Sequence, residues 1–250
     1  MFKQKKYFTI CLIVLTSLVR AITNPILIQA QADFKKVNAS YAKLESYSID
    51  TYYTVYTEHN TQERLESKNG KYVKYKSNSY TMVDDIQTYT INDKIISINK
   101  GDKLISVGDN TPSDTDPLGT NSDSLLTMCS DIKVETINAH EKKYTLLFDN
   151  AENSEYNKVE ISINTLENRY TKLVLFYNME INLKSDFYAD AKQPRLEIMY
   201  KNFKLLTADP QIFNDALYIV NDNEKLKPAP KYYNYRLVDL RNKTRIKKNK

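Results

Sequence analysis

The sequence predicts a mainly β protein with a few helices, built on a single curved antiparallel sheet of about ten strands. Three observations favour this fold class. Alternation of apolar and polar residues recurs from residue 47 to residue 206, which is typical of half-buried strands. Only two segments have a helical period, and no βαβ alternation occurs. Tyrosine, which favours strands, is abundant at 20 residues. A sheet of this size curls because neighbouring strands twist, so we expect an unclosed β-barrel with a helical lid.

The first 32 residues have the pattern of a secretory signal peptide. Three lysines at positions 3, 5 and 6 precede an apolar run at 7–19, and Ala30-Gln31-Ala32 offers small residues for signal peptidase. The lysine, asparagine, tyrosine and isoleucine bias is typical of bacteria, so we expect export to the bacterial periplasm and a mature chain from Asp33. The alternative is an uncleaved N-terminal anchor, which a second apolar patch at 25–28 favours.

The remaining 218 residues predict one half-barrel domain at 33–240 and a basic flexible tail at 241–250. Four cations leave with the signal peptide, so the formal charge falls from +5 to +1. This balance excludes a nucleic-acid footprint, and we expect no nucleic-acid partner. The six basic residues of the tail could contact anionic lipid head groups. Cys129 is the only cysteine left and is expected to be a small buried hydrophobe.

The helical segments frame the strands. Asp33 can cap an amphipathic helix over 33–45, with Phe34, Val37 and Tyr41 on one face. Residues 108–123 form a long loop, and a short helix follows at 124–131. That helix is either a mobile lid or a core-packing helix. Expected strands lie at 47–55, 62–67, 71–76, 79–83, 86–91, 94–98, 103–107, 132–137, 144–148, 159–163, 173–177, 179–184 and 194–206, before a helical turn at 210–214 and closing segments at 217–219 and 232–237.

The order of these elements resembles a known family. The segments are KLESYSIDTYYTVY, NGKYVKY, INDKIISINKGDKLISV and, after the loop and short helix, YNKVEISINTLENRYTKLVLFY. This arrangement, over residues 33–206, is similar to the outer-membrane lipoprotein carrier (LolA/LolB-like) superfamily. The resemblance implies an unclosed barrel whose helical lid shelters lipoprotein acyl chains in transit through the periplasm.

No catalytic or metal-binding motif stands out, so we expect a non-enzyme without a metal or cofactor. No serine lies between glycines at the spacing of a nucleophile elbow, and His59 and His140 lie far apart without ligand partners. Residues 114–119 resemble a calcium loop, but Leu118 and Leu125 occupy positions where oxygen ligands belong.

The sequence therefore predicts a carrier or binding module that shields a lipid, or the acyl chains of a lipoprotein, in an apolar cavity. An alternative is a structural or adaptor subunit of an envelope assembly, with a filled interior and a protein partner. The strand-face alternation predicts a cavity and lid lined by Tyr53, Val55, Leu125, Met128, Leu175 and Ile198.

Overall fold

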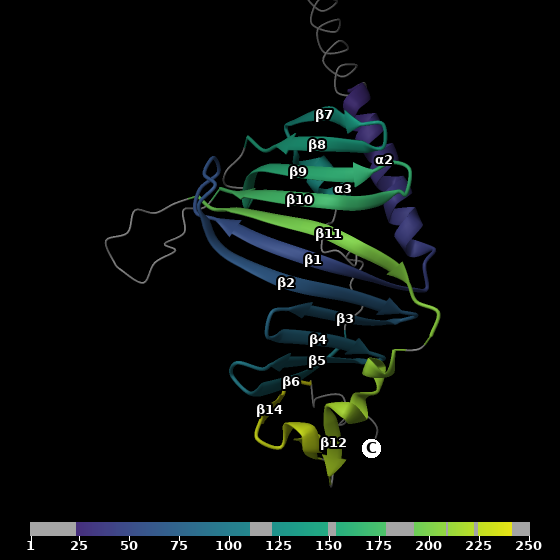
Figure 1. Ribbon diagram of the computed structural model, residues 1–250, viewed down its shortest axis with the longest axis vertical. Helices are drawn as coiled ribbons and strands as arrows, with labels where there is room; N and C mark the ends of the chain where they lie inside the picture. Colours follow the sequence, from purple (N-terminus) through teal and green to yellow (C-terminus); the bar gives the residue numbers. More distant parts are fainter. Residues whose placement is uncertain are drawn as a thin grey trace, which may run out of the picture.

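The protein forms one curved sheet of twelve strands that does not close into a barrel, and a separate two-stranded ribbon (Figure 1). The computed structural model describes residues 24–110, 122–149, 154–178, 193–208, 210–222 and 225–241. The predicted fold class is confirmed. The strands of the sheet are β1 (Ser46–Tyr56), β2 (Arg64–Tyr75), β3 (Asn78–Val83), β4 (Ile86–Ile91), β5 (Lys94–Asn99), β6 (Leu104–Asp109), β7 (Asp131–Asn138), β8 (Glu141–Leu147), β9 (Tyr156–Asn164), β10 (Arg169–Tyr177), β11 (Arg195–Leu205) and β14 (Arg236–Asp239).

The first strand in the sequence lies near the centre of the sheet, and the two halves of the sheet follow one another in the chain. Strands β1 to β6 follow one another away from the centre, and β7 to β11 return from the opposite edge until β11 pairs with β1. All these pairs are antiparallel. Strand β14 then adds to β6 in parallel, which is the one departure from the expected antiparallel sheet among the described strands. The ribbon consists of β12 (Ile219–Asp222) and β13 (Lys225–Pro228).

Strand β2 corrects one sequence expectation. The runs 62–67 and 71–76 were expected as two strands, but residues 64–75 form a single one. Gly70 lies inside this strand because β1 and β3 approach it closely. A Cβ at position 70 would lie 2.7 Å from Cε2 of Tyr53 and 2.8 Å from the carbonyl oxygen of Met82. The glycine therefore marks a close approach of neighbouring strands rather than a turn.

The first helix begins earlier than expected. Helix α2 spans Pro25–Ala42 instead of 33–45, and its N-cap is Asn24, whose side chain accepts hydrogen bonds from the amides of Ile26 and Leu27. Asp33 is thus not a cap but lies in the middle of the helix. The predicted peptidase site at 30–32 falls inside the helix, and Ala30 is 0% exposed. Cleavage of the signal peptide there stays a prediction.

Several other expectations can be placed. The short helix α3 spans Ser122–Met128 rather than 124–131. Residues 1–23 of the signal peptide, 111–121 of the long loop, the expected strand 179–184 and the tail from 242 lie outside the described residues. Within the described part of the chain, no helix has both the length and the apolar character needed to span a membrane.

The first core lies where α2 and α3 cover one face of the sheet. Phe34 packs edge-on against Tyr144 of β8 at 5.1 Å between ring centroids, and Tyr41 stacks on Tyr170 of β10 at 6.1 Å. The hydroxyl of Tyr170 also donates to Oδ1 of Asn38 at 2.9 Å. Helix α2 is therefore fixed on strands β7 to β11 and β1, as Figure 1 shows.

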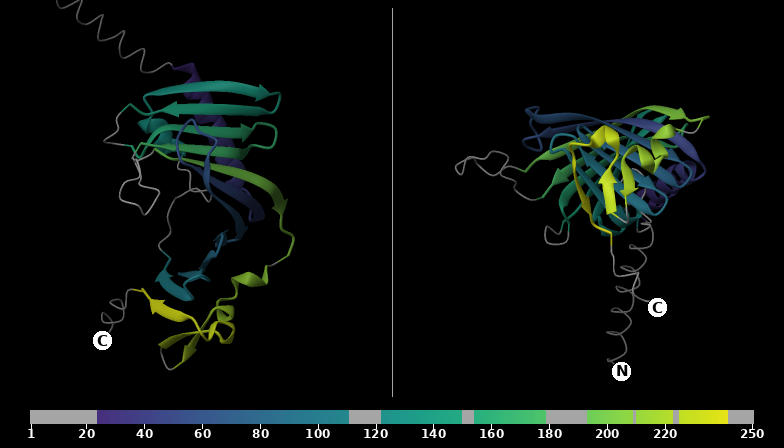
Figure 2. Two further views of the ribbon diagram at one scale, coloured as in Figure 1. Left: turned by 60° about the vertical axis from the view of Figure 1, so that its left-hand side comes forward. Right: turned by 90° about the horizontal axis from the view of Figure 1, so that it is seen from below.

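The second core lies on the opposite face of the sheet. Tyr72 and Val73 are consecutive in β2, yet Tyr72 belongs to the first core and Val73 to the second. Because successive side chains of a strand point to opposite faces, the two cores are on opposite sides of the sheet. The second core is covered by the C-terminal elements η1 (Gln211–Phe213), η2 (Asp215–Leu217) and η3 (Pro230–Tyr232), together with the ribbon. Figure 2 shows these elements beside the half of the sheet that is remote from α2.

Candidate functional site

A pocket of about 950 Å³ lies between strands β2 to β5 and the C-terminal elements. We call it the C-terminal groove. Its floor includes Val73, Tyr80, Met82, Gln87 and Tyr89 from the sheet. Its opposite wall consists of residues that follow β11 in the chain: Leu206, Pro210, Ile212, Ala216, Leu217, Tyr218, Ala229, Pro230, Lys231, Tyr232 and Tyr235.

Strand register orders the floor into rows. Val73 pairs with Tyr80, and Tyr80 pairs with Tyr89, so these three form one row across β2, β3 and β4. In the next row Met82 pairs with Gln87. All five side chains share the face of the second core, because they are separated by even numbers of residues within each strand.

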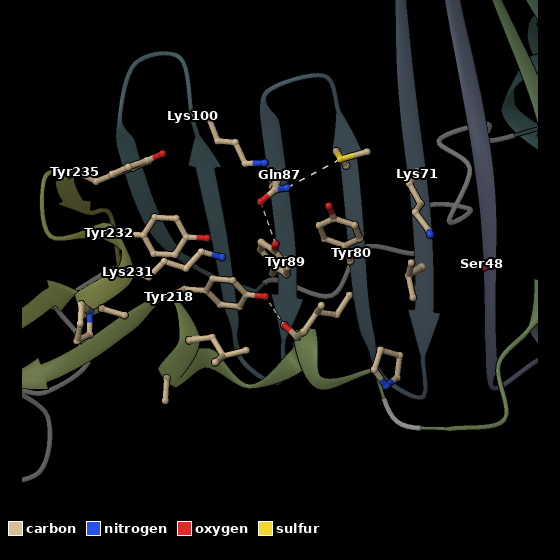
Figure 3. A pocket seen from close by; sticks show the side chains of 18 of the residues that line it. Ser48, Lys71, Tyr80, Gln87, Tyr89, Lys100, Tyr218, Lys231, Tyr232 and Tyr235 are labelled. Atoms are coloured by element: carbon tan, nitrogen blue, oxygen red, sulfur yellow. Dashed lines mark hydrogen bonds between the residues drawn. The ribbon is translucent and has the colours of Figure 1, made fainter.

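Tyrosine rings connect the floor to the wall (Figure 3). The ring centroids of Tyr80 and Tyr89 are 4.8 Å apart, and those of Tyr89 and Tyr218 are 4.2 Å apart. The ring centroids of Tyr218 and Tyr232 are 6.4 Å apart, and those of Tyr232 and Tyr235 are 5.1 Å apart. This continuous aromatic surface gives the groove large apolar area at low cost in side-chain entropy.

Three phenol groups of this surface, those of Tyr80, Tyr89 and Tyr218, stay neutral at physiological pH. Burial, with the neighbouring Tyr89, raises the pKa of Tyr80 to about 12. Burial likewise raises the pKa of Tyr89 and that of Tyr218. The hydroxyl of Tyr89 donates to Oε1 of Gln87 at 3.1 Å, and the hydroxyl of Tyr218 donates to the carbonyl of Ile212 at 2.7 Å. These bonds satisfy the polar ends and leave the ring faces to line the groove.

The wall is attached to the sheet by the buried side chains of the second core and by one ion pair. Phe213 stacks on Tyr75 at 6.3 Å, Tyr218 lies against Tyr89, and Lys94 of β5 forms an ion pair with Asp215 of η2 at 2.8 Å. The elements η1 and η2 are single 3₁₀ turns, which have poorer hydrogen-bond geometry than an α-helix. The floor is therefore part of a continuous sheet, whereas the wall is made of short separate pieces.

The residues predicted to line a cavity lie elsewhere. Tyr53 pairs with Ile198, while Val55 and Leu175 each pair with Leu196, so four of the six predicted residues occupy two adjacent rows on β1, β11 and β10. These rows are on the same face as α2 and α3, as the sequence alternation predicted. None of the four lines the C-terminal groove.

The other two predicted residues come from α3. Leu125 packs against the first core, whereas Met128 is 51% exposed. Helix α3 is held by buried Leu126 and by a hydrogen bond from Nδ2 of Asn38 to Oγ of Ser122 at 3.1 Å. The role of all six residues in ligand binding stays a prediction.

Sequence reasoning missed the groove because its wall folds back over strands that lie more than 100 residues earlier. The available signal was the clustering of tyrosines: two lie in the β3–β4 hairpin, and four lie between residues 218 and 235. The two groups of tyrosines meet only when the C-terminal segment folds over the hairpin. No local sequence pattern predicts that arrangement.

No other described site offers catalytic chemistry of its own. Burial raises the pKa of Cys129, so its thiol is protonated, and the sulfur donates to the carbonyl of Leu126 at 3.3 Å. Nε2 of His59 lies 2.9 Å from the carbonyl oxygen of Tyr177, the last residue of β10. Among the residues the structure describes, no group of three or more histidine, cysteine, aspartate or glutamate side chains could hold a metal ion.

Comparison with solved structures gives likenesses at low sequence identity. No family model matches the sequence, and no curated protein matches it. An uncharacterized conserved protein from Thermus thermophilus is similar over 84% of this chain and 99% of its own, at 11% identity and a TM-score of 0.45. A LolA superfamily protein from Nitrosomonas europaea is similar over 74% and 97%, at 12% identity and a TM-score of 0.29. The lipoprotein LppX from Mycobacterium tuberculosis is similar over 72% and 96%, at 9% identity and a TM-score of 0.40. The structure itself shows the unclosed curved sheet that the LolA-like resemblance implied.

Proposed function

We propose that the protein is a non-enzymatic binding module of the bacterial envelope, which shields the apolar part of a lipid, such as the acyl chains of a lipoprotein, in the C-terminal groove. The observation that carries this proposal is the groove itself. Its volume of about 950 Å³ is at the upper end of ordinary ligand sites, and aliphatic and tyrosine side chains dominate its lining.

Burial alone supplies the binding energy in this proposal. Each methylene group that leaves water contributes about 0.8 kcal/mol, so a chain of ten methylenes gains about 8 kcal/mol before ordering costs are subtracted. The sheet keeps the floor in place while the short wall elements adjust to the ligand. Release then requires the wall to move away from Tyr89, or a second protein that offers a better site.

The proposal extends to cellular location. The predicted signal peptide would place the protein in the periplasm, where a lipid between two membranes needs a protein that excludes water. The basic tail would approach anionic head groups while the groove receives the apolar part.

The test is to fill the groove with a bulky side chain. Ala216 is exposed and lines the wall, so Ala216→Trp narrows the groove with little effect on either core. Ala208→Trp is the matched control, because Ala208 is exposed in the same segment and does not line the groove. Native mass spectrometry after gentle extraction and titration with a fluorescent fatty acid measure the occupied fraction and the affinity.

We expect Ala216→Trp to weaken binding by about tenfold, equivalent to about 1.4 kcal/mol, and Ala208→Trp to bind like the original chain. Equal binding by both variants would contradict the location in the groove. If Val55→Trp abolished binding instead, the ligand would lie on the face of the predicted cavity. Absence of any lipid, together with a tightly bound protein, would favour the adaptor function.

A further inference from the structure

We propose that the ligand of the C-terminal groove is an amphiphile with an anionic head group, and that Lys71 and Lys100 bind this head group. This inference rests on the proposed function and adds the chemical class of the ligand.

The first argument is the charge of the lining. Every charged residue that lines the groove is a lysine: Lys71, Lys100 and Lys231. The whole chain has 36 basic and 31 acidic residues, so the lining is more basic than the chain as a whole. A groove that accepted only neutral lipids would not need cations along its edge.

The second argument is that two of these cations lie at one end of the groove. Lys71 pairs with Met82, Met82 pairs with Gln87, and Gln87 pairs with Ile98, so these residues form one row across β2 to β5. Lys100 lies two residues after Ile98, just beyond the end of β5, and therefore at the same end. Figure 3 shows Lys71 within β2 and Lys100 beyond the end of β5, on either side of Gln87.

The groove therefore has a polar end and an apolar end. Wall residues Pro210, Ile212 and Leu217 belong to the segment of η1 and η2, and they supply aliphatic surface. Between the two ends lie the rings of Tyr80 and Tyr89. An acyl chain along these rings would place its head group near Lys71 and Lys100, which are both exposed and so allow the head group to stay hydrated.

The third argument is that these ammonium groups are not already neutralised. Across the described ranges, no carboxylate forms an ion pair with Lys71, Lys100 or Lys231, and the ammonium of Lys231 lies 5.4 Å from the ring centre of Tyr232. The acids nearest to these lysines are Asp50, which is paired with Lys71 in the register of β1 and β2, and Asp85, whose carbonyl oxygen accepts from the amide of Lys100 at 3.0 Å. Asp215 pairs with Lys94 at 2.8 Å, and Asp50 accepts from Asn202 at 3.0 Å.

Lysine is suited to this role because its ammonium is a mobile point charge that binds phosphate and carboxylate groups. Both groups are head-group chemistries of membrane lipids, and the experiment must separate them. The phenols of Tyr80, Tyr89 and Tyr218 remain protonated at neutral pH and add no negative charge that would repel either group.

The experiment compares short-chain lipids with identical dihexanoyl chains and different head groups: phosphatidylglycerol, phosphatidylcholine and uncharged diacylglycerol. Hexanoate adds a carboxylate. Isothermal titration at two salt concentrations measures the affinity of each. The test variant is Lys71→Gln with Lys100→Gln, and the control is Lys133→Gln with Lys204→Gln, which removes the same charge from exposed strand positions outside the groove.

We expect the original chain and the control to bind phosphatidylglycerol about tenfold more tightly than phosphatidylcholine or diacylglycerol, with an advantage that shrinks as salt rises. The test variant should lose this preference and keep its affinity for diacylglycerol. A preference for hexanoate over phosphatidylglycerol, per chain, would assign the lysines to a carboxylate instead of a phosphate.

Three results would overturn the inference. Equal affinity for all three dihexanoyl lipids would remove the head-group site but leave the proposed function intact. An equal loss in the test variant and the control would show a general effect of surface charge. No binding of any lipid would contradict the proposed function as well.

Discussion

Removal of residues 24–32 should destabilise the protein, because this segment belongs to the first core. Ile26 and Leu27 pack partly buried against it, and Ala30 is completely buried. A half-buried aliphatic side chain contributes about 1 kcal/mol, and the methyl group of Ala30 about 0.8 kcal/mol, so the loss is about 3 kcal/mol. For a domain of this size, that is a decrease in melting temperature of about 6–12 °C.

The assay is thermal unfolding by circular dichroism of two chains that begin at Asn24 and at Asp33. Within the longer chain, Leu27→Ala should lower the melting temperature, and Ile28→Ala should not, because Ile28 is 55% exposed. Melting temperatures within about 2 °C for the two chains would refute the reasoning, since 3 kcal/mol cannot produce so small a shift. Cleavage after Ala32 would then be harmless to the fold.

Three further variants test other parts of the structure. Asp33→Asn should cost about 1–2 kcal/mol above the ordinary carboxyl pKa of 3.8, and this cost should vanish as the pH falls below the lowered folded-state pKa, as measured by urea unfolding across pH 2–7. Asp222→Asn, at an exposed pair, should change little at any pH. Gly70→Ala should cost about 1–3 kcal/mol because its methyl group clashes with β1 and β3, whereas Gly108→Ala meets no atom within 4 Å and should be nearly neutral. Asp215→Asn should speed hydrogen exchange in η1 and η2 and leave the sheet unchanged; protection equal to that of the original chain would show that the ion pair with Lys94 does not hold the wall.

The sign of the Asp33 effect follows from its surroundings. Burial alone would raise the pKa of Asp33, but hydrogen bonds from Lys142 at 2.7 Å and from the hydroxyl of Tyr144 at 2.6 Å, with the charges of Lys142 and Lys36, lower it. A carboxyl group with a lowered pKa in the folded state stabilises the fold above its ordinary pKa. That contribution disappears as the pH falls through the folded-state value, so only the acid limb of the stability profile should differ.

Local periodicity predicted most of the strands. Strand β4 spans Ile86–Ile91 as expected, and β3 and β5 differ by one residue at an end. The same alternation placed Tyr53 and Ile198 on the face that α2 covers, because only one phase of the pattern is apolar. Pairing between strands that are distant in the sequence, such as the parallel addition of β14 to β6, cannot be predicted from local sequence patterns.

The start of α2 was wrong because one segment carries two patterns. Residues 26–32 satisfy the small-residue rule of a signal peptidase, and Ile26, Ala30, Phe34 and Val37 also continue a helical period. A sequence pattern cannot distinguish a signal peptidase site from the packed face of a helix, since both use small and apolar residues. The expected break between the strands 62–67 and 71–76 was also wrong, because Gly70 lies inside β2 where neighbouring strands occupy the space of a side chain.

The arrangement of two cores on opposite faces has a consequence for how this fold can work. A half-barrel with one lid has a single interior, so a ligand competes with the lid for the same space. Here α2 already fills its half with Phe34, Val37 and Tyr41, while the groove lies on the other face and uses a separate wall. Ligand binding in the groove therefore need not displace α2. Strand β2 contributes to both faces, because Tyr72 and Val73 point into different cores. A ligand on one face could therefore affect the other face through the sheet only by shifting this strand. A slip of β2 by one residue would exchange Tyr72 and Val73 and expose both cores, so packing on both faces holds the strand in register. We therefore expect ligand binding in the groove to leave the core under α2 unchanged.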